Sequence, residues 1–274
     1  MKEETVQGAG GVKIHIRSWP AAGKAKAVIV ISHGFNSHSG QYIWAAEQFA
    51  AAGYAVYAAD LRGRGKSEGE RFWVEKPGDY VGDVDLAVQL AKSREPGLKV
   101  FMLGHSAGGV VACTYALDHP TELAGLICES FAFQVPAPEL ALNVLQFVGE
   151  NIAPRLGALK LKNEDFSRDP KVVAALNADP LTKNETQPAR TVAALWAADK
   201  RLKKSFPQIT IPLFIIHGSV DKATVPAGSR FFADTAGSKD KTLKIYDGHF
   251  HDLLADTGKE GVMADILEWV GKRV

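Results

Sequence analysis

Cysteine is scarce in this sequence, which has only Cys113 and Cys128 among its 274 residues. Both lie in apolar stretches, so we expect two buried free thiols, with a disulfide between them as the less favoured alternative. A disulfide-dense secreted scaffold is thereby disfavoured. The cysteine usage instead suits the reducing environment of the cytoplasm, which is the predicted location.

Long apolar runs and an excess of charge of either sign are also missing. The N-terminal residues contain no apolar run that could act as a signal peptide. The longest candidate span, residues 25–32 with Lys26 inside it, is far too short to cross a bilayer. Lysine and arginine number 32 against 31 aspartates and glutamates, a net charge of +1. This balance creates no field that would attract nucleic acid, and we expect no such partner.

What the sequence does have is a regular alternation of short apolar runs and longer helical patterns. The length is sufficient for one large domain with a substantial core. Continuous apolar runs of this kind are typical of strands buried on both faces. The fold class expected is therefore α/β, with a mostly parallel central sheet and helices on both of its faces. Strands are predicted near residues 27–31, 55–59, 99–103, 123–128, 211–216 and 243–246.

The alternation is interrupted between Ser130 and Phe206, where six prolines divide a stretch that looks wholly helical. Strand–helix alternation then returns and continues to the end of the chain. The sequence therefore predicts a core domain made of residues 1–130 and 207–274. Residues 131–206, which we call the cap, are expected to form a helical lid over the carboxyl edge of the sheet.

A nucleophile is predicted at Ser106, within the sequence Gly104-His-Ser-Ala-Gly108. The pattern G-x-S-x-G is weak by itself, but here an apolar strand precedes it and a small-residue helix follows it. A serine in this context lies on a tight strand-to-helix turn, and the flanking glycines leave room for the turn. The helix N-terminus also favours developing negative charge. The alternative is that Ser106 only caps the helix, which would leave the paired glycines unexplained.

A serine hydroxyl needs a base, and the usual chain order after such a turn is nucleophile, acid, histidine. The acid is predicted at Asp221, in the turn after the strand at 211–216. A carboxylate there can orient an imidazole and stabilise its charged form. The base is predicted at His251, after the last strand. His249 is the alternative, and is expected instead to line the rim of the site or pair locally. Neither a metal site nor a cofactor is expected.

The tetrahedral intermediate of acyl transfer needs two donors aimed at its oxyanion. The main-chain amide of Ala107, directly after the nucleophile, is one of them. The second is expected in the loop His33-Gly34-Phe35-Asn36, after the first core strand, and we assign it to the amide of Phe35. The alternative is that His33-Gly34 forms an ordinary turn at the end of a strand.

With these residues assigned, the chain resembles the monoacylglycerol lipase-like branch of the α/β-hydrolases, which is grouped with lysophospholipases and serine aminopeptidases. The resemblance extends over nearly the whole length. It implies the same triad of Ser106, Asp221 and His251, the oxyanion hole at Phe35 and Ala107, and a helical cap over an apolar acyl pocket. Its strongest stretches are residues 32–42, 60–69, 103–109 and 240–251.

Three positions depart from the pattern of the lipases in that branch. A glutamate, an arginine and a second histidine expected around a glycerol head are here Ser37, Gln41 and Leu254. The ester chemistry is unaffected by these changes. They favour a carboxylesterase whose alcohol pocket differs from that of a glycerol lipase.

The predicted function is hydrolysis of small to medium acyl esters through an acyl-enzyme, without a cofactor. The substrate is a small-molecule ester with an apolar acyl group, and contact with a membrane surface through the cap is at most transient. Two alternatives remain: a cofactor-free perhydrolase or acyltransferase using the same triad, and a non-catalytic ligand-binding module. The residues predicted to contact substrate are Asn36, His105, Phe131, Phe147, Val148 and His249.

Overall fold

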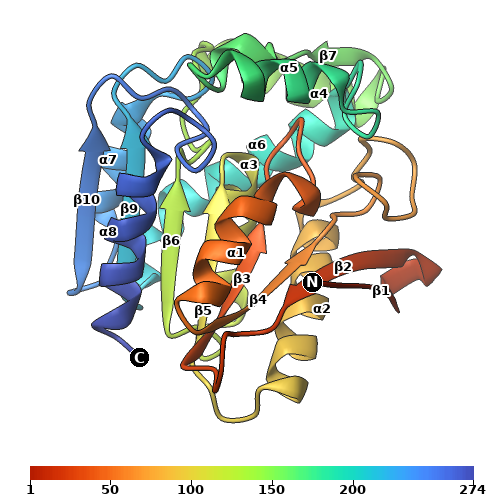
Figure 1. Ribbon diagram of the computed structural model, residues 1–274. Helices are drawn as coiled ribbons and strands as arrows, with labels where there is room; N and C mark the ends of the chain where they lie inside the picture. The colour runs from red at the N-terminus through yellow and green to blue at the C-terminus, as the bar shows by residue number, and fades with distance from the viewer.

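A computed structural model describes residues 1–274 and contains an eight-stranded central sheet with helices on both of its faces (Figure 1). The strand order is β1-β2-β4-β3-β5-β6-β9-β10. The strands are β1 (Lys2–Gln7), β2 (Lys13–Trp19), β3 (Ala27–Ser32), β4 (Tyr54–Ala59), β5 (Val100–His105), β6 (Gly125–Glu129), β7 (Gly157–Leu159), β8 (Gln187–Pro188), β9 (Leu213–Gly218) and β10 (Lys241–Tyr246). The helices are α1 (Ile43–Ala51), α2 (Pro77–Arg94), α3 (Ala107–Asp118), α4 (Glu139–Asn151), α5 (Pro170–Ala178), α6 (Ala189–Ser205), α7 (Pro226–Thr235) and α8 (Lys259–Gly271).

The central strands are fully buried because most of their side chains are apolar on both faces of the sheet. Every residue of β3, β4, β5 and β6 is buried. One face packs against α1 and α8 around a cluster that includes Phe49 and Ile266. The other face packs against α2, α3, α6 and α7 around a larger cluster that includes Val84 and Phe232. The predicted fold class is therefore confirmed.

All pairings from β4 to β10 are parallel, so the carboxyl ends of these strands meet at one edge of the sheet. The chain leaves this edge after β6 and returns to the sheet at β9. Between these strands lies the cap, of which α4, α5 and β7 are seen above the sheet in Figure 1. No helix in the structure combines the length and the apolar character needed to cross a membrane.

The sequence-based interpretation missed two parts of this architecture. Strands β1 and β2 pair antiparallel at one edge of the sheet, and β1 alternates between exposed and partly exposed residues rather than forming an apolar run. The prediction that the cap is wholly helical is also wrong, because β7 and β8 pair in a small antiparallel sheet there. These strands have three and two residues, too few for a period to be read from sequence.

Cys113 on α3 and Cys128 on β6 are both buried free thiols, as expected from the sequence. Their sulfur atoms lie 3.6 Å apart in the packed layer between helix and strand. Burial raises the pKa of the Cys113 thiol well above its ordinary value, because a thiolate would lose its hydration there. The pair therefore acts as ordinary apolar core.

Candidate active site

Ser106 lies between the end of β5 and the first residue of α3, in a backbone conformation that non-glycine residues rarely adopt. Its φ is 54° and its ψ is −123°. The two flanking glycines make this sharp turn possible. A Cβ on Gly108 would lie 2.1 Å from the carbonyl oxygen of Ser32, and one on Gly104 would lie 2.7 Å from the Cβ of Ala112. Helix α3 can therefore pack closely against the sheet, and the strained turn is held in place by its surroundings.

The loop after β3 packs directly against this turn. A Cβ on Gly34 would lie 2.8 Å from the Cβ of Ser106, so only glycine allows the approach. Phe35, Ser106 and Ala107 line the same cavity. The amides of Phe35 and Ala107 donate no hydrogen bond within the protein. Two free donors beside one serine hydroxyl form an arrangement that can bind an oxyanion.

Asp221 and His251 come together from the turns that follow β9 and β10. Nδ1 of His251 lies 2.7 Å from Oδ2 of Asp221, and both side chains are buried. Burial alone would raise the pKa of the Asp221 carboxyl, but the charge of His251 and hydrogen bonds from His217 and His251 outweigh it. The pKa is therefore held well below its ordinary value. An ionised carboxylate of this kind fixes the imidazole tautomer and leaves Nε2 free to accept a proton.

Further contacts hold Asp221 in place, and sequence analysis did not identify them. Oδ1 accepts hydrogen bonds from the amides of Ala223 and Thr224, at 2.8 and 2.9 Å. Oδ2 also accepts one from the Thr224 hydroxyl at 2.8 Å, and it lies 3.0 Å from Nε2 of His217. His217 is fully buried, and its other ring nitrogen bonds to the hydroxyl of Ser229. The i, i+4 spacing of His217 and Asp221 in the sequence could have indicated their contact.

The cavity that contains Ser106 borders the Asp221–His251 pair. Phe166 and Thr224 contact the ring of His251, and both line the cavity that contains Ser106. The Ser106 hydroxyl makes no hydrogen bond to His251 in this structure. The ring bonds only through Nδ1, to Asp221 and Thr224, and Nε2 is free. The bond between nucleophile and base is commonly loose in substrate-free enzymes and tightens when substrate binds.

The cavity at Ser106 has a volume of about 440 Å³, and 17 of its 25 lining residues are hydrophobic. Its walls come from the loop after β6, the cap helices α4 and α6, and the segment around β7. Aliphatic side chains such as Val110, Leu145, Val192 and Leu195 dominate the surface. An apolar chain of a substrate would be buried here, whereas a polar acyl group would lose its hydration.

None of the six residues predicted to contact substrate lies on the wall of this cavity. The ring of Phe131 turns into the core and packs against Phe206 and Phe232. Phe147 on α4 faces outward and is 58% exposed, and Val148 beside it also lies outside the cavity. These orientations on α4 follow from helix phase, since the helix presents Leu142 and Leu145 to the cavity instead.

Two of the three polar residues of that set, Asn36 and His105, are hydrogen-bonded to other parts of the protein. The amide of Asn36 donates to Glu185, and its side chain donates to Asn163 at 3.2 Å. Nδ1 of His249 lies 3.8 Å from the Asp256 carboxylate and makes no hydrogen bond. His105 belongs to a separate polar cluster.

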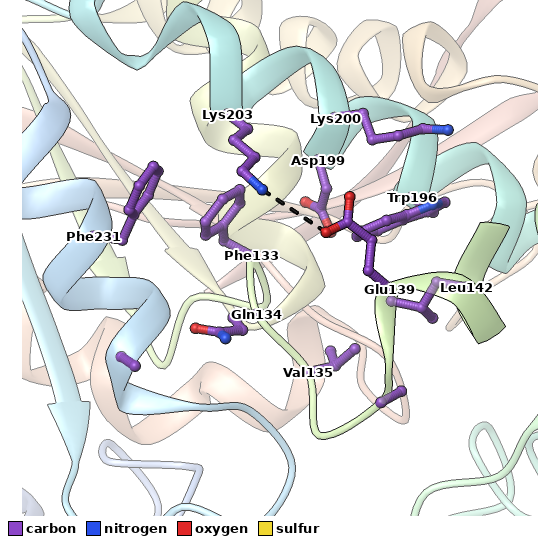
Figure 2. A pocket seen from close by; sticks show the side chains of 12 residues that line it. Phe133, Gln134, Val135, Glu139, Leu142, Trp196, Asp199, Lys200, Lys203 and Phe231 are labelled. Carbon is purple, nitrogen blue, oxygen red and sulfur yellow. Dashed lines mark ion pairs between the residues drawn. The ribbon is translucent and has the colours of Figure 1, made fainter.

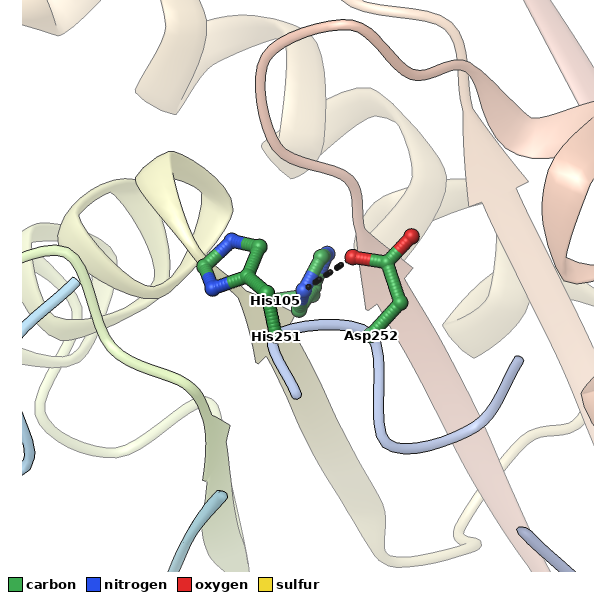
Figure 3. A group of neighbouring side chains, drawn as sticks. All are labelled: His105, His251 and Asp252. Atoms are coloured by element: carbon green, nitrogen blue, oxygen red, sulfur yellow. Dashed lines mark ion pairs between the residues drawn. The ribbon is translucent and has the colours of Figure 1, made fainter. Parts of the chain in front are cut away.

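His105 is buried beside the predicted catalytic histidine, and Figure 3 shows its ring between the ring of His251 and the carboxylate of Asp252. The ring centres of His105 and His251 lie 4.8 Å apart, and Nε2 of His105 lies 3.1 Å from Asp252. Burial opposes the charged ring, but Glu129 and Asp252 raise the pKa of His105 to about 9. His105, His251 and Asp252 could surround a metal ion by their spacing. A protonated His105 has no lone pair to offer one.

A second cavity, of about 350 Å³, lies beside this cluster and contains the three positions that depart from the lipase pattern. Ser37, Gln41 and Leu254 all line it, together with His105 and Asp252. Gln41 is engaged by the cap, since its amide donates to Asp179 at 3.1 Å. The three departures therefore change one continuous surface next to the His105 cluster.

The cap is fastened to the Phe35 loop through a buried ion pair. Glu185 of the cap accepts hydrogen bonds from the amide of Asn36, at 2.9 Å, and from the guanidinium of Arg64. The guanidinium also lies over the ring of Phe35, 4.5 Å from its centre, and donates to Tyr80 at 3.0 Å. Both charged groups are almost fully buried, so a pair that water cannot reach holds the amide of Asn36 and the ring of Phe35.

Replacing Glu185 by alanine should destabilise the protein by about 3–5 kcal/mol, because the Arg64 charge would remain buried without its partner. The rate of ester hydrolysis should also fall, since the Phe35 loop would lose its anchor. Thermal unfolding and kcat are the measurements. The control is Glu164→Ala, an exposed cap residue, which should change neither. Unchanged stability in the Glu185 variant would show that the ion pair does not hold the loop.

The chain matches a known protein family and several known relatives. The model of the Hydrolase_4 family, serine aminopeptidase S33, matches residues 23–258. A monoacylglycerol lipase from Mycolicibacterium smegmatis is 32% identical over 270 residues, which are 98% of this chain and 96% of that protein. The monoglyceride lipase of Homo sapiens is 33% identical over 269 residues, 97% of this chain and 89% of that protein.

Among solved structures, the monoacylglycerol lipase of Paleococcus ferrophilus matches with a TM-score of 0.84 and 27% identity, over 95% of this chain and 99% of that chain. The fold and the relatives together define an α/β-hydrolase, an ester-hydrolysing serine hydrolase. More narrowly, the chain belongs to the Hydrolase_4, serine aminopeptidase S33 family, as the sequence resemblance implied.

Proposed function

We propose that this protein is a carboxylesterase that hydrolyses small to medium, apolar acyl esters through an acyl-enzyme on Ser106. The observation that carries the proposal is the meeting of three groups at one apolar cavity. Ser106 lies on a strained turn at its wall, two unpaired amides flank the serine, and the buried Asp221–His251 pair lies beside it. The relatives named as monoacylglycerol lipases support ester hydrolysis as the chemistry.

The mechanism assigns one role to each of these groups. Ser106 attacks the ester carbonyl while Nε2 of His251 takes its proton, and the amides of Phe35 and Ala107 hold the oxyanion. Asp221 keeps the imidazole oriented and stabilises its charged form. His251 then protonates the leaving alcohol. Water, activated by the same histidine, attacks the acyl-enzyme, releases the acid and restores the serine.

The three departures from the lipase pattern support an ester other than a glycerol ester. Ser37, Gln41 and Leu254 stand together on the second cavity, where the lipase pattern has two charged groups and a histidine. Leu254 offers no hydrogen bond, and Gln41 is already held by Asp179. A glycerol head would therefore find few of its partners here, whereas a simple alkyl or aryl alcohol needs none.

The experiment compares kcat/KM over a chain-length series of p-nitrophenyl esters with monoacylglycerols, a lysophospholipid and a prolyl amide. We expect the simple esters of small to medium chain length to be the best substrates, and the amide to be the poorest. Equal or better turnover of monoacylglycerols would contradict the proposed alcohol specificity. It would leave the assignment of Ser106 untouched.

We also propose that residues 131–206 act as a lid whose contact with lipid is at most transient. Helix α4 exposes Leu140, Val144 and Phe147, by 76%, 56% and 58%, although its neighbours line the acyl cavity. A single row of three exposed apolar side chains supports only weak, reversible contact with a lipid surface. Replacing Phe147 by serine should reduce co-sedimentation with phosphatidylcholine vesicles and leave hydrolysis of a soluble ester unchanged. Strong vesicle binding that survives the change would contradict the proposal.

A further inference from the structure

A carboxyl group without a partner stands in the wall of the acyl cavity, on helix α6 of the cap. Asp199 is only 7% exposed, and its Oδ1 is buried without any hydrogen-bond partner. No lysine, arginine or histidine forms an ion pair with it, so burial alone acts on its ionisation. Buried carboxylates in folded proteins are normally paired or hydrogen-bonded. An unpaired one therefore needs an explanation.

The position of Asp199 relates it to the substrate site. It lines the cavity that contains Ser106 and also a different cavity of about 440 Å³, which we call the outer cavity and which no member of the triad lines (Figure 2). Trp196 and Val135 line both cavities as well. Asp199 therefore lies where the acyl cavity adjoins this outer cavity, at a place that the chain of a bound ester can approach.

The two lysines nearest in sequence are engaged elsewhere. Nζ of Lys203 lies 4.0 Å from the Glu139 carboxylate, and this pair is drawn as the dashed line in Figure 2. Lys200 donates to Asn143 and Gln146 on α4, and its side chain points away from Asp199 in the same view. Neither cation offsets the cost of ionising Asp199, so the charge is not neutralised from within the protein.

The chemistry of the group follows from this isolation. Burial raises the pKa of the Asp199 carboxyl well above its ordinary value, because nothing replaces the hydration that the carboxylate would lose. A neutral carboxyl offers one hydrogen-bond donor and one acceptor. A hydroxyl group has the same two capacities and satisfies both. A plain alkyl chain that reached this point would leave the acid unpaired.

We propose that Asp199 is a specificity-determining residue that selects acyl groups carrying a hydroxyl on the outer half of the chain. The inference rests on the proposed function, since it requires the acyl group to occupy the cavity at Ser106. Asp199 would give the mostly apolar acyl cavity a polar group that can recognise a hydroxyl on the substrate.

The test measures kcat/KM of the full-length enzyme for p-nitrophenyl esters of one chain length. The acyl groups are unsubstituted, hydroxylated at successive positions on the outer half, or aminated at those positions. We expect one hydroxylated isomer to exceed the unsubstituted ester by about 10- to 100-fold, the range for one buried hydrogen-bonded contact. Asp199→Leu should abolish this preference. Asp199→Asn should retain most of it, because the amide also donates and accepts.

Two further readouts separate substrate recognition from a structural role. Removing an unpaired buried carboxyl should raise the melting temperature of Asp199→Leu, whereas loss of a structural contact would lower it. Glu139→Gln, at an exposed residue that lines only the outer cavity, is the matched control and should leave the preference unchanged. Should the leucine variant not fold, the asparagine variant and the isomer series still decide the question.

The outcomes that overturn the inference are distinct from failure of the proposed function. No preference for any hydroxylated isomer, or an equal preference in Asp199→Leu, would overturn the inference while esterase activity remained. A preference for the aminated esters would also overturn it, because Asp199 would then recognise a cation as an ionised group. Absence of turnover for every ester would instead contradict the proposed function itself.

Discussion

Replacement of Ser106 by alanine should reduce kcat for ester hydrolysis by about 10⁶-fold, the loss expected when the nucleophile of a serine–histidine–aspartate triad is removed. The acyl-enzyme cannot form without the hydroxyl, and only the oxyanion donors and substrate binding would remain. The fold should be retained, because Ser106 Oγ makes no hydrogen bond to His251 whose loss would destabilise the turn.

The measurement is kcat with a p-nitrophenyl ester, accompanied by circular dichroism and thermal unfolding of the variant. The matched control is Ser93→Ala, an exposed serine on α2, which should keep full activity. A Ser106→Ala protein that is folded and retains most of its activity would remove the assignment of the nucleophile.

Replacement of Asp221 by asparagine should lower kcat by about 10⁴-fold. An amide at this position can donate to Nδ1 of His251, and this would place the ring proton on Nε2. A protonated Nε2 cannot accept the proton of Ser106. The buried amides of Ala223 and Thr224 would keep an acceptor, so the loop geometry should persist. The expected loss is therefore one of chemistry, with KM changing much less than kcat.

The matched control is Asp247→Asn, an exposed aspartate in the neighbouring turn after β10, which should retain wild-type kcat.

The dependence of protein stability on pH gives an independent test of the Asp221 charge. Because the pKa of Asp221 is lower in the folded protein than in the unfolded chain, its charge stabilises the fold above the unfolded value of about 4. This contribution is lost as pH falls towards the folded value. An asparagine variant with unchanged kcat would contradict the role of Asp221 as orienter.

The fold was predictable because its signals are local. Each central strand is a short apolar run that ends in a turn, and the alternation of strand and helix is sufficient to predict a mostly parallel sheet. Parallel strands bring their carboxyl ends to one edge. Residues 106, 221 and 251 follow three such ends, so topology alone brings their loops together. The edge strand β1 lacks such a signal, since it has no apolar face to bury.

The walls of the acyl cavity were not predictable, because they depend on how helices are rotated. Phe131 and Phe147 are apolar residues of the cap region in sequence, yet one ring turns into the core and the other faces outward. Proline-separated pieces carry no signal for their packing angle. Asp199 was not identified for the same reason, since only the three-dimensional packing of α6 shows that its carboxyl has no partner.

Intact-mass and peptide analysis after reaction with a fluorophosphonate is the most direct test of the central claim, that Ser106 is the serine activated by His251. We predict one covalent adduct per chain, located on the peptide that contains Ser106, with loss of esterase activity in proportion to labelling. Complete loss of activity with the adduct on another residue, or full activity after Ser106 is modified, would contradict the account.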